Sequence, residues 1–264
     1  MKIAFQDSKI EFGELDKITD ALKILDIEPI SFGMPPFTID VTGSESWTEP
    51  TILMGSTKLA KLYCRDQLPE YGIVFYDPEK FDQAHYIGIL KSELLNSEAR
   101  FYTYGSIKDT CINNPIFIKP SSDLKYFAGM VLEADGNSID SALQNERMID
   151  VDMSDDTIVL VNPDIIRDVQ VEYRAFIVDN QIIDCCQYMK YGKVTPEVLM
   201  NDVRAQVYAY IRKIQEIYAP HDHYVIDIAE LSDGTYKVVE YNCINCSGIY
   251  VNDRVLIYKR LTEL

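Results

Sequence analysis

Residues 224–242, YVIDIAELSDGTYKVVEYN, constrain the fold of this chain more than any other segment. Two runs of alternating apolar residues flank Asp233-Gly234, and such a pair predicts a β-hairpin with a two-residue loop. A two-residue loop fixes the register of both strands. Counting back from the loop therefore places Asp227 directly opposite Glu240.

The predicted pairing of Asp227 with Glu240 indicates a metal site, because carboxylates that face each other at about 5 Å repel. In the same register, Glu230 faces Lys237 on the opposite side of the hairpin, where opposite charges are mildly favourable. Asn242 adds an amide oxygen on the face of Glu240. Such oxygen ligands suit Mg²⁺ or Mn²⁺, and magnesium commonly completes its shell with water and phosphate oxygens. The hairpin therefore predicts nucleotide binding.

Composition narrows the class of protein. The 264 residues are 47% hydrophobic, enough for a sizeable core. A net charge of −17 repels nucleic acid phosphates, so we expect no nucleic acid partner. We also expect no membrane span and no signal peptide, because no apolar run has the length of a bilayer and no cationic segment precedes one at the start. A cytoplasmic location is therefore expected.

The six cysteines are expected to be reduced thiols in a chain of this kind. The pair Cys243 and Cys246, together with Cys185 and Cys186, raises an alternative, a zinc-stabilised interaction protein. Adjacent cysteines in a strand point to opposite faces, which argues against a single four-cysteine site.

The pattern of elements changes near residue 110 and predicts two domains. Residues 1–110 alternate short apolar strands with amphipathic segments, which indicates a small α/β domain. Residues 111–264 indicate an α+β domain with a mostly antiparallel sheet, a helix over 139–148 and a long helix whose first turn contains Pro196. The other strands predicted in this half cover residues 116–119, 126–132, 157–161, 171–178 and 181–189.

Three basic residues are candidates for binding phosphate. Lys119 ends an apolar strand and Lys125 follows in a polar loop, so they either hold phosphates or belong to a solvated loop. Arg174 shares a strand face with Glu172 and forms either a surface ion pair or a fork for phosphate oxygens in a cleft. The chain lacks GxxxxGK[ST] and GxGxxG motifs, which excludes a P-loop NTPase and argues against a Rossmann dinucleotide fold.

The order of these features resembles the ATP-grasp superfamily, in particular its phage and bacterial clade of predicted peptide ligases. The resemblance rests on PIFIKPSSDLKYFAGMVL, VEYRAFIVDNQIIDCCQY and the hairpin sequence, and it covers about residues 110–250. It extends more loosely to MGSTKLAKLY at residues 54–63. It implies two α+β subdomains that clasp ATP in residues 111–264, behind the small α/β domain of residues 1–110.

The resemblance also implies roles for the nucleotide-binding residues. Lys119 and Lys125 match lysines that contact the ATP phosphates. Val159, Leu160 and Val161 match a hinge strand whose backbone contacts adenine. Most ATP-grasp enzymes carry several glycines in the phosphate loop, whereas this chain has a single nearby glycine, as does the clade that it resembles.

The remaining implied roles concern catalysis and metal binding. Arg174 matches an arginine near the transferred phosphoryl group. Arg174 and Lys125 are the candidate catalytic residues. Asp227, Glu240 and Asn242 match ligands of Mg²⁺ or Mn²⁺, in agreement with the register of the hairpin.

The activity implied is an ATP- and Mg²⁺-dependent carboxylate–amine ligation through an acylphosphate, with release of ADP. The implied substrates are small molecules or peptides: amino acids, peptides or a protein terminus. The alternative is a nucleotide-binding module without ligase activity, although a binding module has no need to hold metals against a γ-phosphate.

Overall fold

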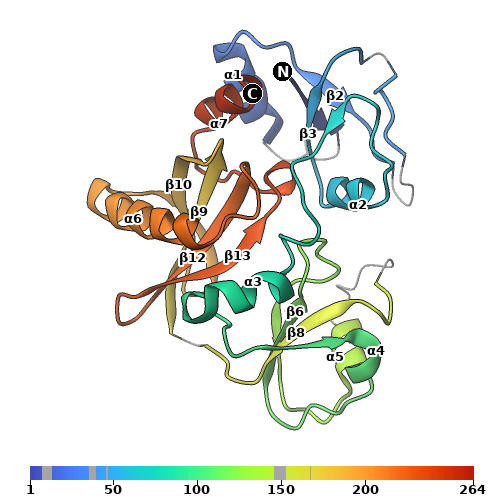
Figure 1. The fold of residues 1–264 in the computed structure, drawn as a ribbon, viewed down its shortest axis with the longest axis vertical. Helices are drawn as coiled ribbons and strands as arrows, with labels where there is room; N and C mark the ends of the chain where they lie inside the picture. The colour runs from blue at the N-terminus through green and yellow to red at the C-terminus, as the bar shows by residue number, and fades with distance from the viewer. Residues whose placement is uncertain (8–13, 36–39, 46, 146–152, 167) are drawn as a thin grey trace.

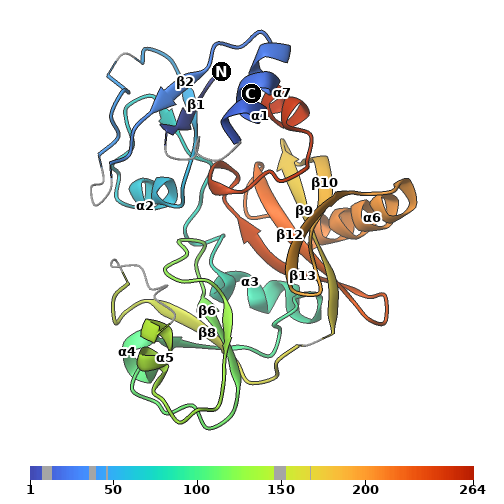
Figure 2. The same cartoon turned by 180° about the vertical axis from the view of Figure 1, so that it is seen from behind.

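The computed structural model describes residues 1–7, 14–35, 40–45, 47–145, 153–166 and 168–264. Three β-sheets follow one another through the molecule, and Figures 1 and 2 show the N-terminal sheet at one end, a long twisted sheet in the middle and a smaller sheet at the other end. Among the described residues, no helix is both long and apolar enough to cross a membrane.

The N-terminal sheet is parallel and has the order β2-β1-β3-β4. Parallel strands with helices between them confirm the predicted α/β character of this region. Its elements are β1 (Lys2–Gln6), α1 (Glu14–Ile24), β2 (Ile30–Phe32), β3 (Thr51–Met54), α2 (Lys58–Cys64) and β4 (Gly72–Ile73).

The smaller sheet is antiparallel and has the order β5-β8-β6-β7. It follows α3 (Gln83–Leu90) and the short helix η2 (Lys91–Glu93). An apolar core that includes Ile118, Phe127 and Leu143 lies between the sheet and its helices. Its elements are β5 (Arg100–Thr103), α4 (Tyr104–Ile107), β6 (Ile116–Pro120), β7 (Met130–Leu132), α5 (Ile139–Asn145) and β8 (Ile158–Asn162).

The central sheet has five antiparallel strands in the order β11-β10-β9-β12-β13. Asp179 and Asn180, which join β9 to β10, have φ of 52° and 56°, as their tolerance of positive φ predicts. Its elements are β9 (Val169–Val178), β10 (Gln181–Lys190), β11 (Lys193–Val198), α6 (Asn201–Ile217), β12 (Tyr224–Leu231), β13 (Tyr236–Asn242), η3 (Ile244–Cys246) and α7 (Arg254–Thr262).

Alternation along β9 gives the central sheet two different faces. Tyr173, Ala175 and Ile177 belong to the core that α6 completes with Val207, Ile211 and Ile214. On the other face, Phe176 and Val178 pack with α7 and the N-terminal sheet. Glu172 and Arg174 lie on that same face, nearer the start of β9, because side chains alternate along a strand.

The β12–β13 hairpin reaches the predicted Asp227–Glu240 pairing by a different route. The loop has three residues, because Leu231 N–H donates to Thr235 C=O at 2.9 Å, and this shifts the register by one. A bulge between Val238 and Glu240 shifts the register back. Between the two shifts, the predicted Glu230–Lys237 pairing is wrong: Lys237 lies opposite Ala229 and Glu230 lies opposite Tyr236.

Two further expectations need correction. Pro196 does not begin the long helix, because it lies in β11, an edge strand where a missing N–H is tolerated. The division predicted at residue 110 cuts through the smaller sheet, because β5 precedes it and yet pairs with β8. We propose a boundary near residue 95 instead. The helix predicted over 139–148 is present as α5, and its last three residues lie outside the described ones.

Candidate active site

Three neighbouring strands present a row of charged side chains to the space between the central and smaller sheets. Arg174 on β9 lies opposite Asp227 on β12, which in turn lies opposite Glu240 on β13. The strand order therefore brings together residues that are far apart in the sequence. The bulge in β13 supports this arrangement, because bulges commonly redirect side chains toward functional sites.

Arg174 and Asp227 form a buried bidentate ion pair. The guanidinium Nε donates to Oδ1 at 2.8 Å and Nη2 donates to Oδ2 at 2.7 Å, while the two residues are 7% and 0% exposed. Burial alone would lower the pKa of Arg174, but Asp227 holds it above its usual range. Arg174 therefore reaches the interior of the site and is not a surface partner of Glu172.

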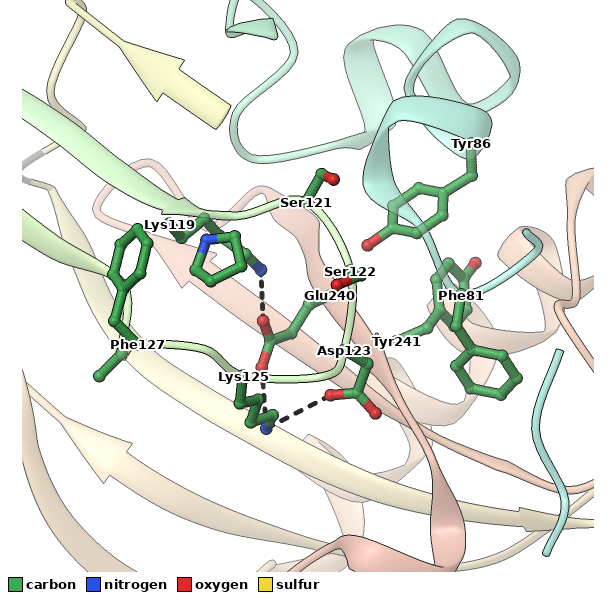
Figure 3. Close-up of a pocket in the computed structure, with 13 residues that line it drawn as sticks. Phe81, Tyr86, Lys119, Ser121, Ser122, Asp123, Lys125, Phe127, Glu240 and Tyr241 are labelled. Carbon is green, nitrogen blue, oxygen red and sulfur yellow. Dashed lines mark hydrogen bonds and ion pairs between the residues drawn. The ribbon is translucent and has the colours of Figure 1, made fainter. Parts of the chain in front are cut away.

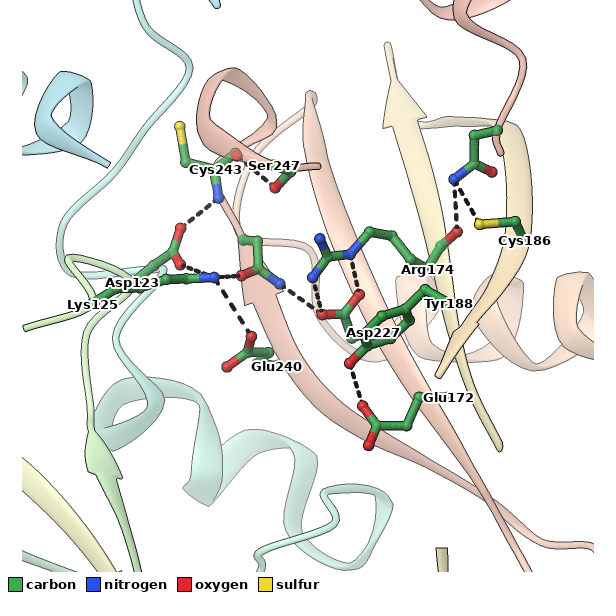
Figure 4. A network of polar contacts seen from close by, with 12 residues as sticks. Asp123, Lys125, Glu172, Arg174, Cys186, Tyr188, Asp227, Glu240, Cys243 and Ser247 are labelled. Atoms are coloured by element: carbon green, nitrogen blue, oxygen red, sulfur yellow. Dashed lines mark hydrogen bonds and ion pairs between the residues drawn. The ribbon is translucent and has the colours of Figure 1, made fainter. Parts of the chain in front are cut away.

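Asp227 also orients Asn242, whose Nδ2 donates to Asp227 Oδ2 at 3.1 Å. This bond turns the amide oxygen of Asn242 toward Lys125, whose Nζ donates to it at 2.7 Å. Figure 4 shows this chain of contacts running from Arg174 across the hairpin to Lys125. The three predicted metal ligands thus belong to one network together with two of the predicted phosphate-binding residues.

The two predicted lysines converge on Glu240. Lys119 Nζ lies 2.5 Å from Oε2 of Glu240, and Lys125 Nζ lies 3.8 Å from Oε1. Figure 3 shows both lysines pointing toward this carboxylate. Burial would raise the pKa of Glu240, but the positive charges of Lys119 and Lys125 outweigh burial and hold it well below its usual range. The carboxylate is therefore a stable anion between two cations.

The polar loop that carries Lys125 is held by side chains rather than by glycines. Asp123 accepts a hydrogen bond from Cys243 N–H at 2.6 Å and lies 3.5 Å from Lys125 Nζ. Burial raises the pKa of Asp123 to about 6, against the opposing influence of Lys125. Ser121 donates to Asp82 Oδ2 at 3.1 Å. These contacts fix the loop between α3 and the end of β13. Neither Asp123 nor Ser121 was predicted from the sequence to have this role.

Close packing against β6 explains the one glycine of this loop, Gly129. A Cβ at this position would lie 3.0 Å from the Phe117 ring and 3.3 Å from Lys119 Cβ, which is tighter than ordinary packing allows. Glycine therefore lets the end of the loop pass close over β6. Phe117 and Lys119 share one face of that strand, because they are two residues apart.

Two adjoining cavities lie along this face. One of about 200 Å³ is lined by Lys119, Lys125 and Glu240. The other is about 600 Å³, is mostly apolar and lies between the two sheets. Both β6 and β13 run from one cavity into the other, with Phe117 and Val239 in the apolar cavity next to Lys119 and Glu240 in the charged one. The charged and the apolar cavity therefore lie next to each other along the same two strands.

The family described as ATP-grasp domain, R2K clade family 2, matches residues 96–260, more than half of the chain. The chain belongs to this ATP-grasp family. The match begins just before β5, in agreement with the start of the smaller sheet. No sequence among curated proteins matches the chain.

Solved structures share the ATP-grasp fold at low sequence identity. D-cycloserine synthetase DcsG has a TM-score of 0.60 and 13% identity, over 100% of this chain and 99% of that chain. D-alanyl-alanine synthetase A from Vibrio cholerae has a TM-score of 0.55 and 12% identity, over 100% and 93%. The ATP-grasp ligase PsnB in complex with a minimal precursor has a TM-score of 0.51 and 12% identity, over 100% and 99%. The predicted superfamily and α+β ATP-grasp fold are therefore confirmed.

The fold does not leave Val159, Leu160 and Val161 free to contact adenine through their backbone. They lie in the middle of β8, which pairs with β5 on one side and with β6 on the other. Val159 and Leu160 are also fully buried. The segment that follows β8 contributes Ile165 and Ile166 to the apolar cavity.

Among the described residues, no group of three or more His, Cys, Asp or Glu side chains is arranged to hold a metal ion. All six cysteines are free thiols, and the alternative of a four-cysteine zinc site has no support. Cys185 packs in the core under α6, whereas Cys186 accepts a hydrogen bond from Asn252 Nδ2 at 3.2 Å. The two adjacent thiols therefore point to opposite faces of β10, as strand geometry predicts.

Proposed function

We propose that the chain is an ATP- and Mg²⁺-dependent carboxylate–amine ligase that forms an amide or peptide bond through an acylphosphate and releases ADP. The observation that carries this proposal is the convergence of Lys119, Lys125 and Arg174 on the row formed by Asp227, Glu240 and Asn242. This row adjoins an apolar cavity between the two sheets. Membership of the ATP-grasp family supports the same reading.

The donor set fits Mg²⁺ or Mn²⁺. Lys125 places an ammonium group next to the oxygens of Asn242 and Glu240, at 2.7 and 3.8 Å, so this position already attracts a cation. Asp227 accepts three hydrogen bonds, and a carboxylate has about four acceptor positions, so one remains. We propose that these three residues hold the metal, which would neutralise charge on the phosphates during transfer.

Lys119 and Lys125 are placed to bind the phosphates as point charges, since each can exchange its present partner for a phosphate oxygen. Arg174 is fixed by Asp227 and is placed to stabilise the phosphoryl group and the acylphosphate. In the proposed reaction the substrate carboxylate attacks the γ-phosphate, ADP leaves, and an amine displaces phosphate from the acylphosphate to give the amide. Positioning and charge stabilisation account for such catalysis.

We propose the 600 Å³ cavity as the site of the adenine and ribose. Apolar side chains of Phe117, Ile165 and Val239 would cover the base, in place of the β8 backbone predicted from sequence. Glu172 lines the same cavity, and burial raises its pKa to about 6, partly offset by the hydrogen bond from Tyr188. A carboxylate at this position could accept hydrogen bonds from ribose hydroxyls.

The substrates that we propose are small molecules or peptides with a carboxylate and an amine. The similar structures include a D-cycloserine synthetase, a D-alanyl-alanine synthetase and a ligase bound to a minimal precursor. We place the reaction in the cytoplasm, in keeping with six free thiols.

The proposal is tested by measuring ADP release from Mg·ATP in the presence of a panel of amino acids and short peptides. We expect steady ADP release by the wild type and at least a hundredfold loss in Glu240→Gln, which removes one charge from the metal site and keeps the shape of the side chain. The matched control is Glu216→Gln on the exposed surface of α6, which should retain wild-type rates. Normal turnover by Glu240→Gln would refute the metal assignment.

The same assay separates the ligase from the nucleotide-binding module. Wild-type protein that binds Mg·ATP and releases no ADP with any member of the panel would favour the module. Mass spectrometry of the reaction mixture should detect an amide product whose mass equals the sum of the two substrate masses less one water.

A further inference from the structure

Arg174 packs against two tyrosine rings that stack on each other. Its guanidinium carbon is 4.8 Å from the centre of the Tyr188 ring and 5.4 Å from that of Tyr250. The two rings are 5.6 Å apart and inclined by 30°. Tyr188 comes from β10 and Tyr250 from the loop between η3 and α7, so two separate segments meet at one guanidinium. Figure 4 shows Tyr188 beside Arg174.

Tyr250 adopts a backbone conformation that is unfavourable for its residue type. Its φ is 53°, in the left-handed region that glycine and asparagine occupy most easily. A large aromatic residue there carries a conformational cost, and such costs cluster at functional sites. The ring of Tyr250 makes the contacts described above with Arg174 and Tyr188, which gives a reason for a tyrosine at this position.

The hydroxyl end of the Tyr188 side chain is held by a hydrogen bond. Its hydroxyl donates to Oε2 of Glu172. Glu172 is two residues before Arg174 on β9 and lines the apolar cavity that we assign to the nucleotide. The orientation of the Tyr188 ring is therefore set by a residue that lies next to the proposed nucleotide.

These contacts leave one edge of the guanidinium available. Nε and Nη2 are both bound to Asp227. Within the described part of the chain, Nη1 has no hydrogen-bond partner. Gly248 lies beside this edge, and a Cβ built on it would be 3.9 Å from Nη1, an ordinary contact distance. A buried guanidinium with one unpaired donor edge is suited to bind an anionic group.

We propose that Tyr188 and Tyr250 are positioning residues that support Arg174, so that its Nη1 edge faces the phosphoryl group and the acylphosphate. This inference rests on the proposed function. Asp227 holds the guanidinium at Nε and Nη2, and the stacked rings pack against it and limit its movement toward their side. Loss of a ring should therefore impair the chemical step more than the binding of ATP.

The first test follows the side-chain Nε–H signal of Arg174 in ¹⁵N-labelled protein, identified by its absence in Arg174→Lys. Tyr250→Gly removes the ring and the unfavourable conformation together. We expect at least tenfold faster hydrogen exchange at Arg174 Nε in this variant. Tyr250→Phe keeps the ring and should remain within twofold of the wild type. Unchanged exchange at Arg174 Nε in Tyr250→Gly would overturn the positioning role of the ring.

The second test separates kcat from KM for Mg·ATP in the ADP-release assay. Tyr250→Gly should lower kcat at least tenfold and leave KM within twofold, and Tyr250→Phe should restore kcat. A kcat within twofold of the wild type in Tyr250→Gly would refute the positioning role. If the wild type itself releases no ADP, the proposed function fails, and Nε exchange still decides whether the rings hold Arg174.

A stability control distinguishes positioning from folding. Tyr191 is also a tyrosine with positive φ, at 51°, and it is 66% exposed. Tyr191→Gly therefore reports the effect of relieving the same backbone conformation away from Arg174. Tyr250→Gly should melt within a few degrees of Tyr191→Gly. If Tyr250→Gly does not fold, Tyr250→Asn replaces it in both tests, because asparagine tolerates the left-handed region.

Discussion

The two faces of the central sheet are built from the same strands and differ in what holds them together. Under α6, Ile226 and Ile228 of β12 are fully buried in a continuous apolar core. Between them in sequence, Asp227 is equally buried on the opposite face, where Arg174 and Asn242 satisfy it. Burial stabilises the first face directly, whereas the second tolerates burial only because each charge has a partner.

The apolar face under α6 therefore contributes mainly to stability, whereas the charged face carries the proposed active site. Substitutions under α6 should change stability and leave the active site intact. Substitutions on the charged face should affect both, since one missing partner leaves another charge buried without compensation. The predictions below use this contrast.

The largest expected effect on stability comes from breaking the Arg174–Asp227 pair. Arg174→Met should lower the free energy of unfolding by about 4 kcal/mol, because it leaves Asp227 buried without its main partner. The double variant Arg174→Met with Asp227→Leu should recover most of this loss, although it should be inactive. Urea denaturation of the three proteins measures both values.

An exposed ion pair provides the control for this prediction. Lys213 and Glu93 lie 2.8 Å apart with side chains that are 55% and 25% exposed. Lys213→Met should cost less than about 1 kcal/mol. A cost for Arg174→Met that is no larger than this would show that the charged face does not depend on its pairing.

On the apolar face, Ile228→Ala should cost about 3 kcal/mol, from lost burial and the cavity that remains. ADP release per folded molecule should stay unchanged, because the side chain points away from the charged row. Val198→Ala, at a position that is 67% exposed, should be nearly neutral. A loss of kcat in Ile228→Ala without a matching loss of folded protein would contradict the separation of the two faces.

A smaller effect should depend on pH. Asp123 has a pKa of about 6 in the folded chain against an ordinary value of 3.8, so the folded state holds its proton more tightly. The stability from this group is complete below pH 3.8 and is lost as pH rises through 6. Relative to Asp123→Asn, the wild type should lose on the order of 2 kcal/mol between pH 4 and pH 6.5. A pH-independent difference would exclude a raised pKa.

The sequence predicted the charged row well because a hairpin is local. The Asp-Gly turn and the alternation of β12 and β13 sufficed to pair Asp227 with Glu240, even though a three-residue loop and a bulge each changed the register by one. The two register shifts cancel at the Asp227–Glu240 pair. They do not cancel at Glu230, which lies between them and therefore faces Tyr236 instead of Lys237. Sequence alone gives no clear signal for a bulge at Val239.

Other features depend on contacts between distant segments, which a single sequence does not specify. The backbone of β8 is paired on both sides because β5 and β6 flank it, and this excludes the predicted adenine contact of Val159, Leu160 and Val161. The positions of Asp123 against Cys243 and of Tyr250 against Arg174 also arise only in the folded chain. Asp123, the one acidic residue within the lysine-bearing loop, was the signal available in the sequence.

The most direct test is the binding of a non-hydrolysable ATP analogue, measured by calorimetry with and without Mg²⁺. For the wild type we expect binding that weakens at least tenfold when EDTA removes the metal, and for Glu240→Gln we expect weaker binding that no longer responds to Mg²⁺. Absence of binding to the wild type, or equal binding by both proteins with and without metal, would contradict the assignment of the charged row as an Mg·ATP site.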